Sequence, residues 1–417
     1  MRILYALTDP PCPPTTGGRQ RSFLQLQALR EIADLHVALL PEGALKPEEA
    51  AETQRLFGPI SVIPPRPAGR LAPWNLARWT WPRFFDRLAG ALDPRYPALA
   101  LDEQERQAFD HIVRDFRPDL CFARYFHAAN RTGVSSHPPA MIDLDDLDTE
   151  YLKQSIREPG TPAWRKLVTR ARLRHLESRF RPELSRFSGI LLASPEDLPH
   201  AAGLPVAIAP NIPFINQGRG RDPLPPDPDS SQILIVATLG YLPNIHGLDR
   251  FLTRAWPEII ARRPDATLNI VGGGLRAAER ERWNRIPGIH ITGFVDSLEA
   301  QYARAAFAIA PIYLGGGTKI KVLEALAYGR TCVVTPDAHR GYQRSLPHGE
   351  ALLRAGTDAE FADCCVQLLA DTSLRDRLAA NGHAAVSTQY TYPHLRNTLH
   401  AEVAKALGNQ TGRKNAL

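Results

Sequence analysis

The stretch from residue 306 to residue 335 reads "AFAIAPIYLGGGTKIKVLEALAYGRTCVVT". Its apolar ends, 306–311 and 331–335, have the length and composition of buried strands. The segment 318–328 between them has the apolar spacing of a helix. A strand, a helix and a second strand in this order predict a parallel β-sheet with helices packed on it.

Two lysines, Lys319 and Lys321, lie at the start of this helix, where the helix dipole makes positive charge unfavourable. Thr318 is the expected N-cap and Gly329 the expected end. The turn before the helix consists of three glycines, Gly315, Gly316 and Gly317. Glycines let a ligand approach the backbone, and the free amides of a first helical turn attract anions. A bound diphosphate would therefore make the lysines favourable; the alternative is an ordinary turn with solvated lysines.

A carboxylate follows on the same face of this helix, because Glu324 lies three residues after Lys321. A carboxylate can accept hydrogen bonds from both hydroxyls of a ribose. The alternative is a local Lys–Glu pair, although the order with glutamate first is the more favourable one. Diphosphate and ribose sites on neighbouring turns predict a site for a nucleoside diphosphate.

The same rhythm of strands and helices extends in both directions along the chain. Further strands are expected at 2–7, 35–40, 119–125, 140–144, 189–194, 232–238, 267–271 and 289–294. Further helices are expected at 19–32, 152–187, 246–262, 297–305, 358–371, 374–388 and 393–407.

These elements predict an α/β protein of two doubly wound, Rossmann-like domains that face each other across a cleft. Proline, glycine and aspartate dominate residues 214–231, which we expect to be a linker. The expected domains are 1–213 and 232–392. The remainder, 393–417, is expected to form a helix that crosses back to the first domain, followed by a tail from 408 without regular structure.

Composition limits the classes of function. The chain has 417 residues, of which 44 % are hydrophobic and 23 % charged, as in soluble globular proteins. A net charge of +6 favours anionic partners, but the charge is spread out and no RNA-binding or zinc-finger pattern occurs, so nucleic acid is not an expected partner. Five cysteines without a CxxC pair predict buried free thiols and a cytoplasmic protein.

Three consecutive stretches carry a resemblance to a known family: "ILIVATLGYLPNIHGLDRFL" (233–252), "PDATLNIVGGG" (264–274) and "ITGFVDSLEAQYARAAFAIAPIYLGGGTKIKVLEALAYGRTCVVT" (291–335). Their order and spacing resemble family-4-type retaining glycosyltransferases of the GT-B fold, the glycosyl transferases group 1. The resemblance implies transfer of a sugar from a nucleoside diphosphate sugar to an acceptor hydroxyl, with retention, in polysaccharide or glycolipid assembly. It implies no cofactor and no metal.

The resemblance also implies roles for individual residues. Glu324 would hold the donor ribose, Gly240 would lie beside the diphosphate, and Phe294 and Val295 would lie beside the base. Gly17 and Gly18 match a glycine pair that faces the donor across the cleft in the family.

Two positions depart from the family pattern. Gly316 stands where many members have a glutamate near the transferred sugar. The loop "GYLPNIHG" (240–247) lacks the usual Arg and Lys, and His246 is its only basic residue. Lys319 and Lys321 are then expected to supply the charge that grips the diphosphate.

The first half offers candidates for the acceptor side. In "MIDLDDLDTEY" (141–151), Asp143 and Asp145 follow a strand and are candidates for binding the acceptor hydroxyl or the sugar. A metal site formed by the aspartates, or simple capping and solvation, are the alternatives. His127 is a further cleft candidate together with Arg124, against the alternative of an ordinary structural histidine.

The segment 70–90 interleaves arginines with Trp and Phe residues, which suits an anionic membrane surface and a lipid-linked acceptor. Core packing of this segment is the alternative. Two other functions also stay open. One is a nucleotide-sugar epimerase or hydrolase of similar fold, and the other is a non-catalytic nucleotide-binding homologue.

Overall fold

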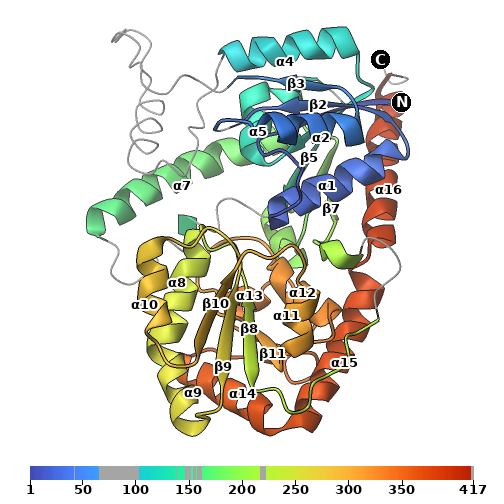
Figure 1. Ribbon diagram of the computed structural model, residues 1–417. Helices are drawn as coiled ribbons and strands as arrows, with labels where there is room; N and C mark the ends of the chain where they lie inside the picture. Colours follow the sequence, from blue (N-terminus) through green and yellow to red (C-terminus); the bar gives the residue numbers. More distant parts are fainter. Residues whose placement is uncertain are drawn as a thin grey trace. The chain divides into compact units, whose positions relative to one another are not determined.

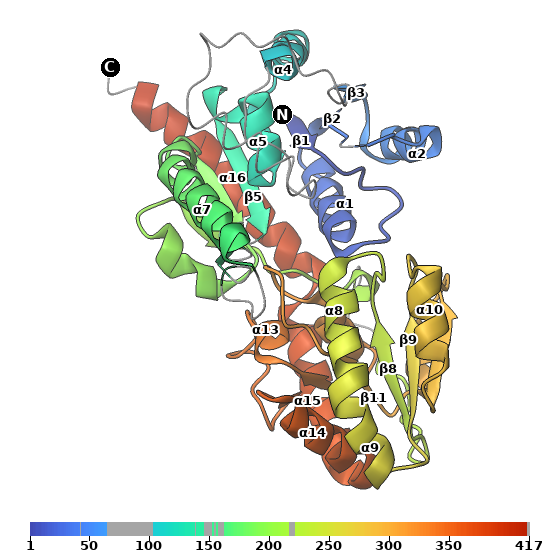
Figure 2. The same cartoon turned by 90° about the vertical axis from the view of Figure 1, so that its left-hand side faces the viewer.

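The computed structural model describes residues 1–41, 43–64, 103–137, 139–145, 152–153, 156, 162–216 and 222–414. The segment 70–90 and Asp146 and Asp148 of the aspartate cluster lie outside these ranges. The chain forms two compact units, and Figures 1 and 2 show the elements of each. The first unit contains residues 1–209 and 395–417, and the second contains residues 210–394.

The described part of the first unit has one parallel sheet in the order β3-β2-β1-β4-β5-β6-β7. Its strands are β1 (Arg2–Leu7), β2 (Asp34–Leu39), β3 (Ile60–Val62), β4 (Leu120–Arg124), β5 (Ala140–Asp145), β6 (Gly189–Leu192) and β7 (Val206–Ile208). In register, Ile3 lies opposite Leu35 of β2 on one side and Leu120 of β4 on the other. The strand order reverses between β1 and β4, so this point is the topological switch of the sheet.

Helices cover this sheet, and their apolar faces close its core. They are α1 (Gly17–Arg30), α2 (Pro47–Phe57), α4 (Glu103–Phe116), α5 (Phe126–Thr132), α7 (Ala163–Leu184) and α16 (Tyr392–Lys414), with 3-10 turns η2 (Val134–Ser136) and η3 (Pro195–Ala201). The central strands are buried almost completely, as expected for a parallel sheet covered on both faces. The last helix packs on this unit, because the His400 Nε2 lies 2.8 Å from the carbonyl oxygen of Ala28.

The second unit repeats the plan with the strand order β10-β9-β8-β11-β12-β13. Its strands are β8 (Gln232–Val236), β9 (Thr267–Val271), β10 (Ile289–Gly293), β11 (Phe307–Ala310), β12 (Cys332–Val334) and β13 (Leu353–Arg354). Its helices are α8 (Leu242–Arg250), α9 (Trp256–Arg262), α10 (Ala277–Asn284), α11 (Glu299–Arg304), α12 (Ile320–Ala327), α13 (Pro336–His339), α14 (Asp358–Ala370) and α15 (Thr372–Gln389), with the 3-10 turn η4 (Phe214–Asn216). The switch point of this sheet lies between β8 and β11.

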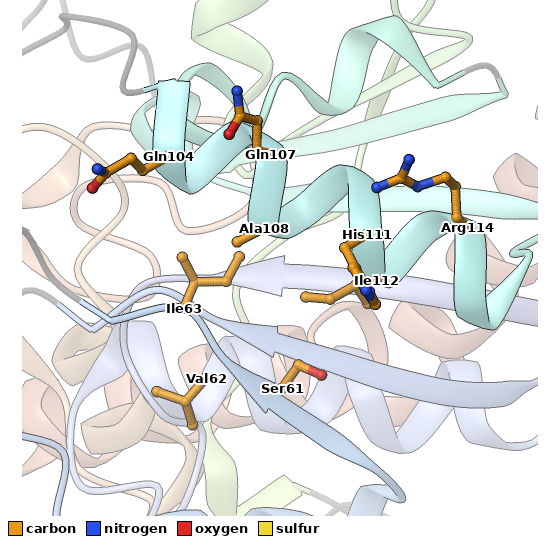
Figure 3. A pocket seen from close by; sticks show the side chains of 9 residues that line it. All are labelled: Ser61, Val62, Ile63, Gln104, Gln107, Ala108, His111, Ile112 and Arg114. Carbon is orange, nitrogen blue, oxygen red and sulfur yellow. The ribbon is translucent and has the colours of Figure 1, made fainter.

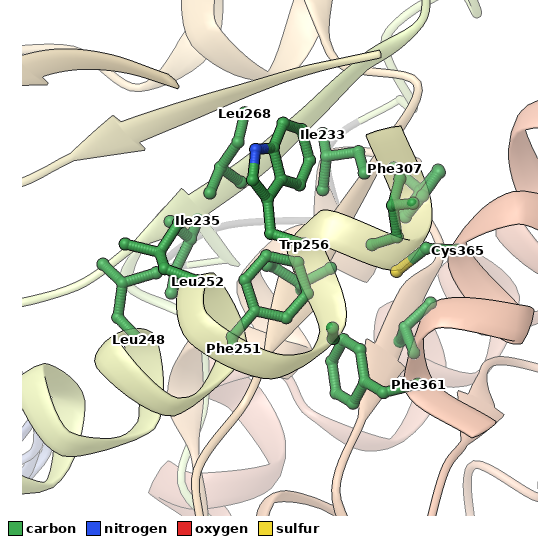
Figure 4. Close-up of a cluster of buried hydrophobic side chains, with 14 of the residues drawn as sticks. Ile233, Ile235, Leu248, Phe251, Leu252, Trp256, Leu268, Phe307, Phe361 and Cys365 are labelled. Atoms are coloured by element: carbon green, nitrogen blue, oxygen red, sulfur yellow. The ribbon is translucent and has the colours of Figure 1, made fainter. Parts of the chain in front are cut away.

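The core of the second unit is built around Phe251 and Trp256, which Figure 4 shows among the apolar side chains of β8, β9, β11 and α14. Both aromatic residues belong to a π-helical segment (Phe251–Ala255) and the start of α9. Pro257 follows at once and has no N–H to donate, which accounts for the widened helical turn at this point. The helix continues through it, so the prediction of one helix over 246–262 holds, with an earlier start at Leu242.

The structure confirms the predicted fold class of two doubly wound α/β domains, and most predicted strands agree with it to within one or two residues. Three short strands, β3, β7 and β13, were not predicted, because two or three residues carry too little pattern. The prediction for the tail is wrong: α16 continues to Lys414. Gly329 ends α12 as predicted, with a φ of +76°.

Residues 222–228 of the expected linker are held against the second unit by two arginines. The buried guanidinium of Arg330 donates to the carbonyl oxygens of Leu224 (3.0 Å) and Pro225 (2.7 Å). Arg375 donates in the same way to Asp227 and Pro228. This part of the segment therefore has fixed backbone partners. No helix within the described ranges is both long enough and apolar enough to span a membrane.

Candidate functional site

The first candidate site lies in the second unit, where the chain leaves β11 at Ala310 and enters α12 at Ile320. This is the carboxyl edge of the sheet beside its switch point, where doubly wound sheets bind ligands. Gly315 and Gly317 have φ values of +102° and +69°, which L side chains rarely adopt. The glycines are therefore required for the turn that delivers the start of α12 to this edge.

The start of α12 differs by one residue from the prediction. Lys319, not Thr318, occupies the N-cap position, and its side chain does not cap the helix. The Thr318 hydroxyl instead accepts a hydrogen bond of 2.8 Å from the Asn211 side chain. The glycine turn therefore extends through Thr318, and the first helical residue is Ile320.

The ammonium group of Lys319 forms hydrogen bonds with the backbone of the glycine turn. Its Nζ donates to the carbonyl oxygens of Gly315 (3.2 Å) and Gly317 (2.7 Å), and also to that of Gly316. In a trans peptide the N–H points opposite to the C=O. The amides of residues 316–318 therefore point away from Lys319, which fixes the backbone of the turn through its three carbonyl contacts.

Lys321 connects this helix to the loop after β8. Its Nζ donates to the Asn244 side-chain oxygen over 2.7 Å, and the Asn244 amide donates to the Thr238 carbonyl oxygen over 2.8 Å. Burial lowers the pKa of Lys321 to about 7, and the charge of Lys319 acts in the same direction. No carboxylate among the described residues forms an ion pair with Lys321, so an anionic ligand would relieve this shift.

Glu324 lies one turn further along α12 and is half-buried. Burial raises the pKa of its carboxyl group to about 7, while Lys321 and a hydrogen bond with Tyr302 act in the opposite direction. Tyr302 is itself fixed, because its buried ring stacks on that of Tyr328 at 4.4 Å between centroids. Lys321 and Glu324 thus both titrate near neutrality, which is a feature of functional sites.

Two neighbouring loops at the same edge of the sheet approach each other closely. The Leu239 amide donates to the Gly273 carbonyl oxygen over 2.7 Å, and a Cβ on Gly274 would lie 2.7 Å from the Gly240 nitrogen. Gly240 itself is exposed, and a Cβ there would make ordinary contact with the Gly274 carbonyl oxygen at 3.7 Å. The expected phosphate-side loop is therefore an accessible backbone segment supported by glycines.

Phe294 and Val295 follow β10 at this edge. The Phe294 side chain is 65 % exposed, although it is aromatic, and Val295 is half-buried. A Cβ on Gly273 would lie 3.6 Å from the Phe294 Cβ, so the ring stands beside the glycine loop after β9. An exposed aromatic ring in this place can stack on a planar base.

The second group of predicted residues lies at the carboxyl edge of the first sheet. Asp143 is completely buried there, and both of its oxygens accept hydrogen bonds. Arg21 donates twice at 2.8 Å, Gln25 donates at 2.7 Å, and Arg124 forms an ion pair at 2.9 Å. Burial alone would raise the pKa of Asp143, but Arg21 and Arg124 outweigh it and lower the pKa to about 2.

Asp143 is therefore permanently ionised and enclosed, which corrects the expectation that it contacts an acceptor or the sugar. It acts instead as the anion that holds two arginines in the interior. Asp143 and Asp145 both form ion pairs with Arg124. The metal alternative required two carboxylates that bind a metal ion, and these two carboxylates bind arginine.

Arg124 also connects two residues with unusual backbone conformations. Its NH2 group donates to the Tyr125 hydroxyl and to Asp145, each at 2.9 Å. Tyr125 and Asp145 end neighbouring strands with φ values of +67° and +64°. Non-glycine residues are held in such conformations mostly at functional sites. Asp145 is half-buried, so the structure leaves part of it accessible, unlike Asp143.

His127 lies beside these residues, with its Nε2 2.9 Å from the Thr8 hydroxyl and its ring stacked on Tyr125. Burial lowers the pKa of His127 to about 4, assisted by Arg131 and Arg124, so the imidazole is neutral at pH 7. Gly18 lies against the same tyrosine, because a Cβ there would be 2.9 Å from the Tyr125 hydroxyl. Gly17 is the exposed first residue of α1.

The first unit thus brings Gly18, His127 and Asp145 together around Tyr125, while Asp143 lies beneath them. Sequence reasoning missed Arg21, Gln25 and Tyr125 in this group, and it missed Asn244 and Tyr302 in the other. Arg21 and Gln25 carry one local signal: they are four residues apart on α1 and thus share a face with apolar neighbours.

A cavity of about 650 Å³ opens elsewhere in the first unit, between the edge strand β3 and helix α4. Figure 3 shows the side chains that line it, among them Ser61, Gln107 and His111. None of the predicted site residues lines this cavity, and β3 lies two strands away from the switch point. We therefore place the candidate site at the carboxyl edges of the sheets.

Comparisons with known proteins give the relatives of the chain. Residues 231–371 match the family model "Glycosyl transferases group 1". An uncharacterized 44.6 kDa protein in the cps region of Klebsiella pneumoniae is 25 % identical over 171 residues, which are 39 % of this chain and 44 % of that protein. This chain therefore matches less than half of the length of that relative.

Two solved structures share the fold over nearly the whole chain. HepE of Anabaena, in complex with UDP and glucose, has a TM-score of 0.62 and 13 % identity and covers 97 % of this chain and 99 % of its own. Sucrose-phosphate synthase of Thermosynechococcus elongatus has a TM-score of 0.66 and 15 % identity over 98 % and 99 %. Residues 231–371, within the second unit, thus match the glycosyl transferases group 1, and the chain shares its two-domain α/β fold with these solved structures.

Proposed function

We propose that this protein is a glycosyltransferase that moves a sugar from a nucleoside diphosphate sugar to a hydroxyl group of a glycan or lipid-linked acceptor. The observation that carries the proposal is the pair Lys321 and Glu324 on α12, directly behind the glycine turn. Both groups have pKa values displaced toward neutrality by burial, and a ligand with a diphosphate and a ribose would reverse both displacements.

The donor would lie along the carboxyl edge of the second sheet. Its base stacks on Phe294 near Val295, and its ribose hydroxyls donate to Glu324. Its diphosphate accepts hydrogen bonds from the amides of residues 316–318 and from Lys321, with Gly240 close by. Lys319 stays behind the turn and aligns the amides, so its contribution to binding is indirect.

The chemical step would be promoted by stabilisation of the leaving diphosphate. Negative charge develops on the diphosphate oxygen as the bond to the sugar breaks. In this proposal the amides of the turn and the Lys321 ammonium group lie beside this oxygen before the charge appears, so little reorganisation would be needed. Retention at the anomeric carbon and a role in polysaccharide or glycolipid assembly are parts of this proposal that rest on the family resemblance.

The acceptor side would be formed by the first unit. Asp145 and His127 are the polar groups that remain partly accessible around Tyr125, and both can accept a hydrogen bond from a sugar hydroxyl. His127 is neutral at pH 7 because of its lowered pKa, so it can act as an acceptor without first losing a proton.

A binding measurement tests the donor site. Thermal unfolding of wild type and Glu324→Ala is followed with a panel of nucleoside diphosphates and nucleotide sugars, beginning with UDP because HepE was solved with it. A ligand at about a hundred times its Kd stabilises by about 2.7 kcal/mol. The proposal expects one base to stabilise wild type and not the variant. Absence of any stabilisation of wild type would overturn it.

Product analysis then separates the activity from its alternatives. A transferase forms product only with an acceptor, whereas an epimerase or hydrolase turns over the donor alone. A third outcome is a protein that binds nucleotide without turnover, and Gly316, in place of the family glutamate, is the feature relevant to it. Gly316→Glu is the variant that tests whether this position limits the rate.

A further inference from the structure

Helix α7 (Ala163–Leu184) carries most of the net charge of the protein. Its sequence contains seven Lys or Arg residues and two Glu residues, a net charge of +5, while the whole chain has +6. The helix is long, and Figure 1 shows it in green within the first unit. A helix with this charge attracts anionic surfaces.

One side of α7 is committed to the core of the first unit. Leu173 and Phe180 pack against that core, Leu184 is buried in it, and the ring of Phe180 lies 4.8 Å from that of Phe126. These three residues are spaced by seven and four positions, which places them on one face of a helix. The C-terminal half of α7 is therefore fixed to the sheet.

Another side of α7 is exposed and combines apolar and basic residues. Trp164 is 51 % exposed and Leu167 is 67 % exposed, and both count among the few large hydrophobic side chains exposed in the described ranges. Arg170 and Arg174 are exposed as well and continue the same row at spacings of three and four. We call these four residues, Trp164, Leu167, Arg170 and Arg174, the α7 stripe.

Glu177, the acidic residue that follows this row on α7 three positions after Arg174, is already paired with a cation. Glu177 forms an ion pair with Lys153 at 3.7 Å. The stripe therefore presents positive charge beside two large apolar side chains. Large exposed apolar residues next to cations are typical of surfaces that enter a lipid interface, where tryptophan favours the headgroup level and arginine the phosphates.

We propose that the α7 stripe binds an anionic lipid surface, with Trp164 and Leu167 entering the interface and Arg170 and Arg174 pairing with lipid phosphates. Each basic residue near such a surface contributes about 1 kcal/mol, so the binding is reversible and sensitive to salt. Binding of a nucleic acid would account for the exposed arginines but not for the exposed Leu167.

The test is co-sedimentation of the full chain with vesicles of phosphatidylcholine, with and without phosphatidylglycerol, at low and high salt. Wild type is expected to bind the vesicles that contain phosphatidylglycerol and to dissociate at high salt. The double variants Trp164→Ser/Leu167→Ser and Arg170→Glu/Arg174→Glu are each expected to weaken partitioning by about tenfold or more. No donor or acceptor is present, so the result is independent of the proposed activity.

Matched controls separate the stripe from general effects. Leu198→Ser removes another exposed apolar side chain of the first unit, which is 39 % exposed. Arg282→Glu/Arg285→Glu makes the same change in charge on α10, where both arginines are exposed. Both controls are expected to bind vesicles like wild type.

Three results would overturn the proposal. They are no binding of wild type to anionic vesicles, stripe variants that bind like wild type, and controls that lose as much binding as the stripe variants. Binding of a single-stranded oligonucleotide that depends on the arginines but not on Trp164 and Leu167, without vesicle binding, would assign the helix to nucleic acid.

Discussion

The two sheets each place charged residues at their switch points, but the charges are balanced in one unit and unbalanced in the other. In the first unit, Asp143 receives Arg21, Gln25 and Arg124, and its pKa is lowered to about 2. In the second unit, the hydrogen-bond partners of Lys321 and Glu324 within the described ranges are the neutral side chains of Asn244 and Tyr302, and the pKa of each is displaced to about 7.

This difference separates a structural charge cluster from a binding site. Where the protein supplies every counter-charge, ionisation is reinforced and the groups are locked in place. Where it does not, burial weakens ionisation, and a ligand with the opposite charges gains free energy by restoring it. Of the two clusters, the α12 pair is the one whose displaced pKa values a ligand could reverse, whereas Asp143 is fully paired by the protein.

The largest effect is expected when the balanced cluster is broken. Asp143→Asn leaves Arg21 and Arg124 buried without their main counter-charge, which should reduce the free energy of unfolding by about 3–5 kcal/mol. Urea unfolding measures it. The control is Asp265→Asn, which breaks an exposed pair with Arg263 and should change stability by less than about 1 kcal/mol. Similar losses in the two variants would show that the cluster is not structural.

The unbalanced site should respond in the opposite direction. Glu324→Gln removes a carboxylate whose pKa is raised by burial, so the raised pKa penalises its ionised form above pH 7. The variant should then be more stable than wild type by about 1 kcal/mol at pH 8, and equal to it at low pH, where both side chains are neutral. Nucleotide binding should be weakened at the same time. A variant that is less stable at pH 8 would contradict the description of Glu324 as unsatisfied.

Variants of the two lysines distinguish a direct contact with the diphosphate from an indirect effect through the glycine turn. Lys319→Met should increase hydrogen exchange in the peptide that contains residues 315–318 of the ligand-free protein, because the three carbonyl contacts are lost. Lys321→Met should leave this peptide unchanged. Both should weaken nucleoside diphosphate binding by about tenfold. Unchanged exchange in Lys319→Met would mean that Lys319 acts on the phosphate itself.

The smallest effect is a transfer of protons on binding. At pH 7, a diphosphate should raise the pKa of Lys321 and take up a fraction of a proton, whereas ribose should lower that of Glu324 and release one. The proton uptake at Lys321 and the proton release at Glu324 should nearly cancel in wild type. Calorimetry in buffers of different ionisation enthalpy should show net uptake of about half a proton in Glu324→Gln and net release in Lys321→Met. The reverse signs would exclude this scheme.

The sequence predicted that the α12 residues of the candidate site lie close together, and the structure agrees. The glycine turn, the lysines and Glu324 lie within ten residues, so helix periodicity alone placed them together. Their partners could not be predicted in the same way. Asn244 is 77 positions from Lys321, and Arg21 is 122 positions from Asp143. Such pairs depend on which loops and helices the strand order brings to one edge.

Backbone conformation was the second feature that could not be predicted from the sequence. Aspartate adopts a positive φ more readily than most residues, but nothing in the residue type of Tyr125 indicates one, because the surrounding contacts impose it. The tail was misjudged for a related reason. Glycine lowers helix propensity by about 1 kcal/mol, but Leu399, Val403 and Ala406 are buried and already form the helix, and extending a formed helix is much easier than starting one.

The assignment of α16 to the first unit has a consequence for biosynthesis. Residues 395–417 follow the whole second unit in the chain, yet Leu395, Leu399 and Val403 are buried in the packing of the first unit. On the ribosome, the first unit emerges first but must wait for its last helix until the second unit has been made. The second unit, as one continuous segment, can complete its fold earlier. The unit that is translated first is therefore the one that is finished last.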